Sequence, residues 1–169
     1  MNICWYLINT HSYQGKKMHF GYIIPKPKTP DNDHEYLEVL AKNIFRMGFN
    51  WIVVEERWPE IRKAFDEFRV EKVAGYTESD VMRLLDDKRM IRHRKKIEAI
   101  ISNATLVRAI ANQFGSFKEY LKSFRDEPYH RRRDRIALSF RNLGKTGAFC
   151  FLYTINEEVP KWEERLSEL

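Results

Sequence analysis

Five basic side chains gather where one helical pattern gives way to the next, and this position makes them candidates for binding an anion. The cluster consists of Arg92, His93, Arg94, Lys95 and Lys96. It follows a helical pattern at Ser79–Asp86 and opens another at Lys95–Gln113. Helix N-termini attract anions through their amides and dipole, whereas cations disfavour that end. Five basic groups there predict a bound anion such as a phosphate, although charge alone fits a solvated basic loop equally well.

The same cluster belongs to a longer pattern of motifs. Gly48-Phe49-Asn50-Trp51 comes first, Arg62-Lys63-Ala64-Phe65 and Val70-Glu71-Lys72-Val73-Ala74 follow, and Ile91-Arg92-His93-Arg94 with Lys96-Ile97 comes last. This order resembles the DNA-3-methyladenine glycosylase I family of the helix-hairpin-helix DNA glycosylase superfamily, of which the chain looks like a divergent member. The resemblance implies an all-α helical bundle with a cleft.

It also implies an enzyme of base-excision repair. Such a glycosylase flips a damaged base out of the duplex, stacks it on aromatic rings and hydrolyses its N-glycosidic bond. The expected substrates are alkylated bases such as 3-methyladenine, and the expected partner is double-stranded DNA. Two alternatives stay open, a non-catalytic helix-hairpin-helix DNA-binding module and a glycosylase for a different lesion.

The resemblance carries two residues over as catalytic candidates. Trp51 stands at the position of the family's pocket tryptophan, although a core tryptophan is the plainer interpretation. Asn43 stands where the family has a pocket glutamate, eight residues earlier. Asparagine brings no negative charge to hold a cationic base. We therefore expect weaker binding of 3-methyladenine or a different preferred base, unless Asn43 is simply exposed.

Further candidates surround these two. Trp5, Tyr13 and Tyr22 are the aromatic residues that we expect to line the base pocket, with packing as the alternative. The residues expected to bind DNA are Arg89, Arg92, His93, Arg94, Lys95 and Lys96. The turn before them, Asp87–Met90, lacks the glycine of many such hairpins, which predicts strain or a different turn shape. A second basic run, His130–Arg135, is either a phosphate track or a solvated helix face.

No metal or other cofactor is expected. The family binds a structural zinc through an N-terminal Cys and His and a C-terminal His-x-x-x-Cys. Cys4, His11 and His19 are present, but no histidine follows residue 130, and Cys150 lies in an apolar segment. A tetrahedral site needs four ligands, so we expect the tail at Glu157–Leu169 to close that end of the fold by packing.

The chemistry expected is simple hydrolysis. Many helix-hairpin-helix glycosylases place an aspartate after the hairpin, but none occurs between Asp87 and Asp126. A cationic base is already a good leaving group, so flipping and positioning matter more than acid–base catalysis. A lyase step through Lys42 is formally open but not expected, because helical lysines are usually solvated.

The elements that must position these residues are helices with short connections. Residues 1–30 are predicted to be irregular, with an extended connector at Pro25–Pro30. Helices are predicted from Asp31 or Asp33 to Gly48, over Trp51–Phe68 with a kink or new start at Pro59, and after the cap Thr77. The remaining predicted helices are 95–113, 117–124, 130–143, 146–155 and 160–168.

Composition sets the outer bounds. The chain has 169 residues, a net charge of +6 and a pI near 9.3, which favour a single domain with a polyanionic partner. The domain spans 1–169, with the clearest match at 31–124 and divergent ends at 1–30 and 130–169. Two cysteines favour a reducing compartment, and no apolar run reaches the ~20 residues of a membrane span. We expect a monomer in the cytoplasm, associated with the nucleoid, or in the nucleus of a eukaryote.

Overall fold

A computed structural model describes the backbone of residues 12–13, 16–19 and 22–165 and the side chains of residues 23–165. The described elements are β1 (Ser12–Tyr13), β2 (Lys16–His19), β3 (Tyr22–Ile23), α1 (Asp33–Arg46), α2 (Trp51–Ala64), η2 (Asp66–Phe68), α3 (Val70–Val73), α4 (Glu78–Asp86), α5 (Arg94–Phe114), α6 (Phe117–Lys122), α7 (Tyr129–Ser139), α8 (Gly144–Thr154) and η3 (Trp162–Glu164). The body of the protein is therefore helical, which confirms the predicted all-α class.

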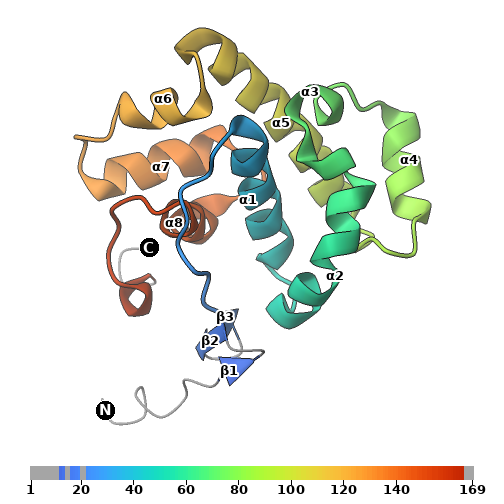
Figure 1. The fold of residues 1–169 in the computed structure, drawn as a ribbon, viewed down its shortest axis with the longest axis horizontal. Coiled ribbons are helices and arrows are strands. Elements are labelled where there is room, and N and C mark those ends of the chain that lie inside the picture. The colour runs from blue at the N-terminus through green and yellow to red at the C-terminus, as the bar shows by residue number, and fades with distance from the viewer. Residues whose placement is uncertain (1–11, 14–15, 20–21, 166–169) are drawn as a thin grey trace.

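Helix α1 lies at the centre of this body. It packs against α2, α5 and α8, with α2–α4 on one side and α6–α8 on the other (Figure 1). Leu37, Leu40, Ala41 and Ile44 are fully buried, as their helical spacing predicts. Asn32 caps the first turn by accepting a hydrogen bond from the amide of Glu35 at 3.1 Å. A central helix of this kind fixes the positions of whatever its C-terminal end carries.

The predicted caps and stops position the next helices. Gly48 follows the end of α1 with a φ of +79°, a conformation that favours glycine. Thr77 and Asp80 form a capping box at the start of α4. Gly115 ends α5 with a φ of +87°, and Ser116 caps α6 through the amide of Glu119. These local signals set the boundaries within one or two residues.

The predicted helix over residues 51–68 differs from the structure in two ways. Pro59 lies inside α2 without ending it. The predicted helix instead stops at Ala64, because Asp66, Glu67 and Phe68 have φ values of 52–58°. The Tyr76 hydroxyl donates to the Asp66 carboxylate at 2.6 Å and Phe68 is fully buried, so tertiary contacts support this turn.

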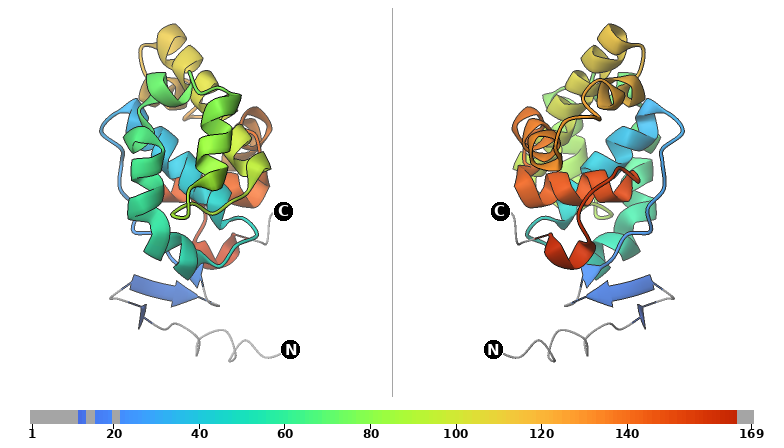
Figure 2. Two further views of the ribbon diagram at one scale, coloured as in Figure 1. Left: turned by 90° about the vertical axis from the view of Figure 1, so that its right-hand side faces the viewer. Right: turned by 90° about the vertical axis from the view of Figure 1, so that its left-hand side faces the viewer.

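The N-terminal arm also differs from the irregular segment that was expected. Strands β1, β2 and β3 form an antiparallel sheet in that order, with Ser12 paired with Lys17 and Met18 paired with Ile23. The strands lie at one end of the helical body (Figure 2). Strands of two to four residues are too short to show an alternating pattern. Within the described residues, no helix is both long and apolar enough to cross a lipid bilayer.

Candidate functional site

The turn between α4 and α5, residues 87–93, is closed by an aspartate instead of a glycine. The Asp87 carboxylate accepts a hydrogen bond from the amide of Arg89 at 2.9 Å, and the amide of Met90 donates to the carbonyl of Asp87 at 3.1 Å. None of these seven residues has a positive φ. The predicted strain is therefore absent, because the Asp87 side chain supplies the turn that a left-handed glycine would otherwise make.

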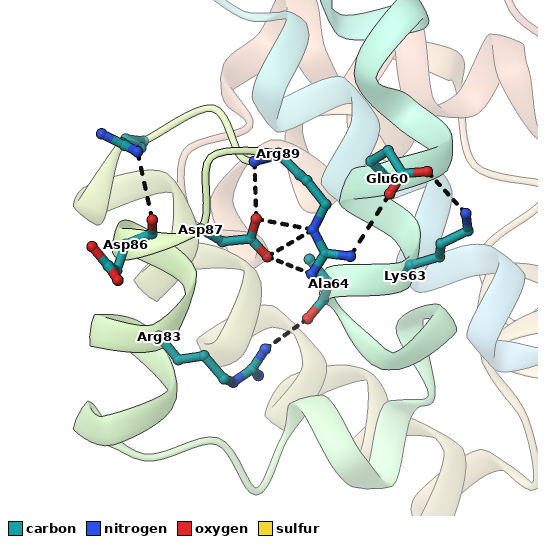
Figure 3. A network of polar contacts seen from close by, with 8 residues as sticks. Glu60, Lys63, Ala64, Arg83, Asp86, Asp87 and Arg89 are labelled. Carbon is teal, nitrogen blue, oxygen red and sulfur yellow. Dashed lines mark hydrogen bonds and ion pairs between the residues drawn. The ribbon is translucent and has the colours of Figure 1, made fainter.

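Arg89 holds this turn against α2. Its guanidinium forms a two-pronged pair with Asp87, at 2.9 and 2.6 Å, and its Nη1 lies 3.7 Å from the Glu60 carboxylate (Figure 3). The hydrogen bonds from Arg89 lower the pKa of Asp87 to about 2. The Arg89 side chain is half exposed. Arg89 therefore has a structural role in the turn of residues 87–93, called the hairpin below, besides any contact with a phosphate.

The start of α5 presents the other predicted DNA-binding residues in different ways. Arg92 and Lys95 are exposed. Arg94 pairs with two acids, Glu78 at 2.8 Å and Glu98 at 3.1 Å. His93 caps the helix, since its Nδ1 accepts from the amide of Lys96 at 3.4 Å. Arg92 and Lys95 are consequently the cations at this helix start that are best placed for an external anion.

Lys96 does not fit the role predicted for it. Its side chain is 7% exposed, and its Nζ donates to the carbonyls of Ile44 and Met47 at the C-terminal end of α1. Burial lowers the pKa of Lys96 to about 8. The ammonium also lies over the ring of Phe49, 5.2 Å from its centroid. Lys96 therefore ties α5 to the end of α1, and a phosphate cannot reach it without breaking that tie.

Trp51 lines a small cavity. It stands at the far end of the loop of residues 47–51, whose first residue, Met47, accepts a hydrogen bond from Lys96. The cavity, called the Trp51 cavity below, has a volume of about 130 Å³. Its lining residues are Arg46, Met47, Gly48, Trp51, Thr146, Cys150 and Arg165. Trp51 opens α2 after Asn50, which caps the helix through the amide of Ile52 at 2.9 Å. Trp51 is 4% exposed and meets Trp162 edge to face at 6.1 Å. Trp51 thus packs in a core cluster and also lines the cavity, and its role in binding a base stays a prediction.

Arg46 covers the indole of Trp51. Its guanidinium carbon lies 4.8 Å from the ring centroid, and its side chain is 4% exposed. Glu55 holds it through a 2.6 Å ion pair and also pairs with Lys42 at 2.5 Å. The pKa of Arg46 is lowered overall, because the effect of burial exceeds the opposing effect of the Glu55 carboxylate. No sequence argument had singled out Arg46, since an arginine near the end of a helix usually lies in solvent.

A larger cavity lies on the opposite side of Arg46. It has a volume of about 970 Å³ and is bounded by residues 23–28, α1, α2 and the end of α8. Charged side chains line it, and several of them pair with one another, as Glu38 does with Arg62 at 3.1 Å. Glu38 also accepts a hydrogen bond from the Trp58 indole at 2.8 Å. Arg46 belongs to both cavities and thus stands in the wall between them.

Asn43 lies in α1, one turn before Arg46, and is fully buried rather than exposed. Its Nδ2 donates to the carbonyl of Val39 at 2.9 Å. Its Oδ1 is buried without a hydrogen-bond partner in the described part of the chain, and Asn43 lines neither cavity. The unpaired acceptor is the one feature of Asn43 that favours a ligand over packing.

Two of the three aromatic residues predicted for the base pocket belong to the N-terminal strands. Tyr13 ends β1 and Tyr22 begins β3, whereas Trp5 lies outside the described residues. Cys4 and His11 also lie outside them. Burial raises the pKa of the Cys150 thiol to about 12, which keeps it neutral. Cys150 does not fit a zinc site, and the residues described here contain no cluster of metal-ligating side chains.

Phe49 belongs to the Gly-Phe-Asn-Trp motif, and no role was predicted for it. It is 37% exposed, its ring meets His93 at 5.9 Å, and it is the neighbour of cavity-lining Gly48. The loop of residues 47–51 therefore joins the start of α5 to the Trp51 cavity. Only this contact across the fold, and no local pattern, brings the basic hairpin and the cavity together.

A family model described as methyladenine glycosylase matches residues 26–143. The chain belongs to this family. It is 35% identical over 102 residues to DNA-3-methyladenine glycosylase 1 of Escherichia coli (strain K12). This alignment covers 56% of this chain and 54% of that protein. It is 34% identical over 77 residues to the Haemophilus influenzae DNA-3-methyladenine glycosylase, or 46% and 42% of the two chains. The chain spans about half the length of these curated relatives.

Solved structures of the family have the same fold. A crystal structure of 3-methyladenine DNA glycosylase I matches with a TM-score of 0.66 and 26% identity, over 76% of this chain and 81% of that one. A variant of such an enzyme in complex with 3-methyladenine matches with a TM-score of 0.67 and 25% identity, over 80% and 82%. The resemblance read from the hairpin and the Gly-Phe-Asn-Trp motif is thus confirmed.

Proposed function

We propose that the chain is a monofunctional DNA-3-methyladenine glycosylase-like hydrolase of base-excision repair, acting on alkylated bases such as 3-methyladenine in double-stranded DNA. Family membership supports the activity. The observation that carries the proposal is the loop of residues 47–51, which links the basic start of α5 to the cavity that Trp51 lines. A base-flipping enzyme needs these two parts at a fixed distance, because the phosphates position the duplex while the pocket receives the base.

The hairpin and the start of α5 bind the phosphates of the DNA. Arg92 and Lys95 reach phosphates from the start of α5, whose amides and dipole add to the attraction. Arg89 joins them only if it shares its guanidinium with Asp87. Phe49, which is exposed and contacts His93, is the residue proposed to fill the space that the flipped base leaves.

The reaction is hydrolysis of the C1′–N bond. The bonding electrons leave with the base, water adds its oxygen to C1′ of the oxocarbenium-like sugar, and one proton of that water passes to the base or to solvent. Trp51 stacks the flipped base. Asn43 lines neither cavity, so its unpaired oxygen contributes only if base binding opens a path to it. Lys42 is paired with Glu55, which does not favour a Schiff base, so no lyase step is proposed. The chain is proposed to work as a monomer without zinc or another cofactor.

The test is release of bases from N-methylated duplex DNA, resolved by chromatography. The wild type is expected to release free 3-methyladenine, and Trp51→Leu to lose at least about tenfold in rate, since base–aromatic stacking is worth ~1–3 kcal/mol. Trp58→Leu is the matched control, because Trp58 is equally buried but does not line the Trp51 cavity. Rates are divided by the folded fraction. Salt-sensitive DNA binding without any base release would favour the non-catalytic binding module instead.

A further inference from the structure

Lys96 satisfies the C-terminal end of α1 from a different helix. The last carbonyls of a helix have no partner within it, and the negative end of the helix dipole lies among them. In α1 the carbonyl of Asn43 accepts a hydrogen bond from the amide of Met47 at 3.1 Å. The carbonyls of Ile44 and Met47 accept instead from the Nζ of Lys96. The loop of residues 47–51 thus begins where a cation of α5 holds it.

The same turn of α5 carries a cation that faces solvent. Lys95 is exposed, whereas Lys96 is 7% exposed. Ile97 and Ile100 are fully buried in this part of the helix, so the start of α5 is fixed in the core. Neighbouring positions of a helix point about 100° apart around its axis. A phosphate at Lys95 and the carbonyls at Lys96 therefore lie at a separation that the helix sets.

Phe49 lies against this start of α5. The Lys96 ammonium lies 5.2 Å from the centroid of the Phe49 ring, and the His93 ring meets that ring edge to face at 5.9 Å. His93 also caps α5, since its Nδ1 accepts from the amide of Lys96 at 3.4 Å. Phe49 is 37% exposed in this position. The ring that is proposed to fill the space of a flipped base is therefore held by two side chains at the start of α5.

Burial of the Lys96 ammonium is unfavourable by itself. It lowers the pKa of Lys96 to about 8, and no carboxylate offsets it among the described residues. An apolar side chain of similar length would avoid this cost but would leave two carbonyls without a donor. The contact specifies one position of the loop, because a single side chain meets both carbonyls and the Phe49 ring.

We propose that Lys96 is a positioning residue, which holds the loop of residues 47–51 so that Phe49 enters the duplex in register with the phosphates bound at the start of α5. This inference rests on the proposed function and assigns to it a residue that contacts neither the base nor the DNA. A base-flipping enzyme brings its filling side chain to one base pair while the phosphates fix the duplex. Helix α5 supplies both reference points, because Lys95 faces solvent and Lys96 faces the loop.

The experiment measures Kd by fluorescence anisotropy for two duplexes of one sequence, one intact and one with a tetrahydrofuran abasic-site analogue. The wild type is expected to prefer the analogue, because Phe49 fills its gap without displacing a base. Lys96→Met should reduce this preference about fivefold or more, the effect of one lost aromatic stack. Kd for the intact duplex, referred to the folded fraction, should stay within about twofold, because Lys95 is unchanged. A purely structural lysine would leave the preference as it is.

Two other variants show how this effect arises. Arg83→Met is the matched control, because Arg83 makes the same kind of contact at the end of α2 remote from Trp51, donating to the carbonyl of Ala64 at 3.1 Å (Figure 3). It should lower stability and leave the preference unchanged. Phe49→Ala should itself lose the preference, and adding Lys96→Met to it should change nothing further, since the two residues act as one unit. Losses that multiply would mean that Lys96 does not act through Phe49, which overturns the proposal.

Base release from N-methylated duplex DNA is measured separately. Per folded molecule, Lys96→Met should lose at least about tenfold in kcat through misplacement of the loop, whereas Arg83→Met should not. If the wild type releases no base, the proposed glycosylase function fails, and the preference for the abasic analogue, which needs no bond breaking, still decides the role of Lys96. Equal binding of both duplexes by the wild type, or a proportional loss on both in Lys96→Met, overturns the inference. Lys96→Gln, which keeps an amide donor in the site, takes the place of Lys96→Met if the latter does not fold.

Discussion

The two basic runs of this sequence, at residues 92–96 and 130–135, differ in which of their side chains are exposed to solvent. At the start of α5, Arg92 and Lys95 are exposed beside a helix N-terminus. In α7, by contrast, Arg132 and Arg133 are each 5% exposed. Arg132 donates to the carbonyls of Glu127 and Glu158, and Arg133 pairs with Asp134 at 2.8 Å. Charge density alone does not separate a binding surface from a structural clamp, because a guanidinium can be satisfied by carbonyls and carboxylates of the protein as well as by an external anion.

The run at 130–135 was predicted to be either a phosphate track or a solvated helix face, and neither prediction accounts for its buried arginines. Buried Arg132 joins the loop before α7 to the segment after α8, and buried Arg133 pairs with its neighbour Asp134, while His130, Arg131 and Arg135 remain exposed. Within the run at 92–96 the same division recurs on a smaller scale, since Lys96 is buried and Lys95 is not. The comparison predicts that variants of buried cations lose stability, whereas variants of exposed hairpin cations lose DNA affinity.

The largest effect is expected for Arg132→Met. This change removes a buried cation that bonds two carbonyls and lies 3.7 Å from Glu157. Breaking a buried pair costs about 3 kcal/mol or more, and urea unfolding measures it. Arg131→Met, its exposed neighbour, should change stability by less than about 0.5 kcal/mol. Equal stability of the two variants would refute the clamp role of α7.

Lys96→Met should come next. The change removes a charged donor from two carbonyls, which costs about 2 kcal/mol. Because the folded-state pKa of about 8 lies below the ordinary value of 10.5, the unfolded chain binds more protons between these values. Wild-type stability relative to the variant should therefore rise as pH increases from about 8 to 10.5. A constant difference across that range would contradict the buried position of the amine.

Asp87→Asn tests the turn itself with a smaller expected effect. Asparagine keeps the acceptor for the amide of Arg89 but loses the charged pair. The pKa of Asp87 is about 2 in the folded protein, below its ordinary value of 3.8. The wild type should exceed the variant in urea midpoint above pH 4, and the gap should close as pH falls to 2. A gap that persists at pH 2 would mean that packing, and not the ion pair, holds the turn.

Lys95→Ala should have the smallest effect on folding and a clear one on binding. One lost phosphate contact lowers DNA affinity and reduces the salt slope by about 1, as measured by anisotropy at several salt concentrations. Lys118→Ala on α6 is the matched control, since it is equally exposed and far from the hairpin (Figure 1). An unchanged slope for Lys95→Ala would remove this lysine from the DNA surface.

The sequence by itself determined the family of the chain and the positions of those helices that have strong local signals. The apolar spacing of α1, the capping box at Thr77 and the glycines after α1 and α5 act over a few residues, so they can be read in order along the chain. The loop of residues 47–51 and the basic start of α5 were found for the same reason.

Only the tertiary structure decided which of these residues meet. It buried Lys96 under α1, placed Arg46 over Trp51, and brought Phe49 against His93. Each contact joins segments whose distance in space is set by packing and not by spacing along the chain. The sequence could name the cations and the aromatic residues of the site, but burial fixed which cations remain available for a ligand and which one holds the loop of residues 47–51.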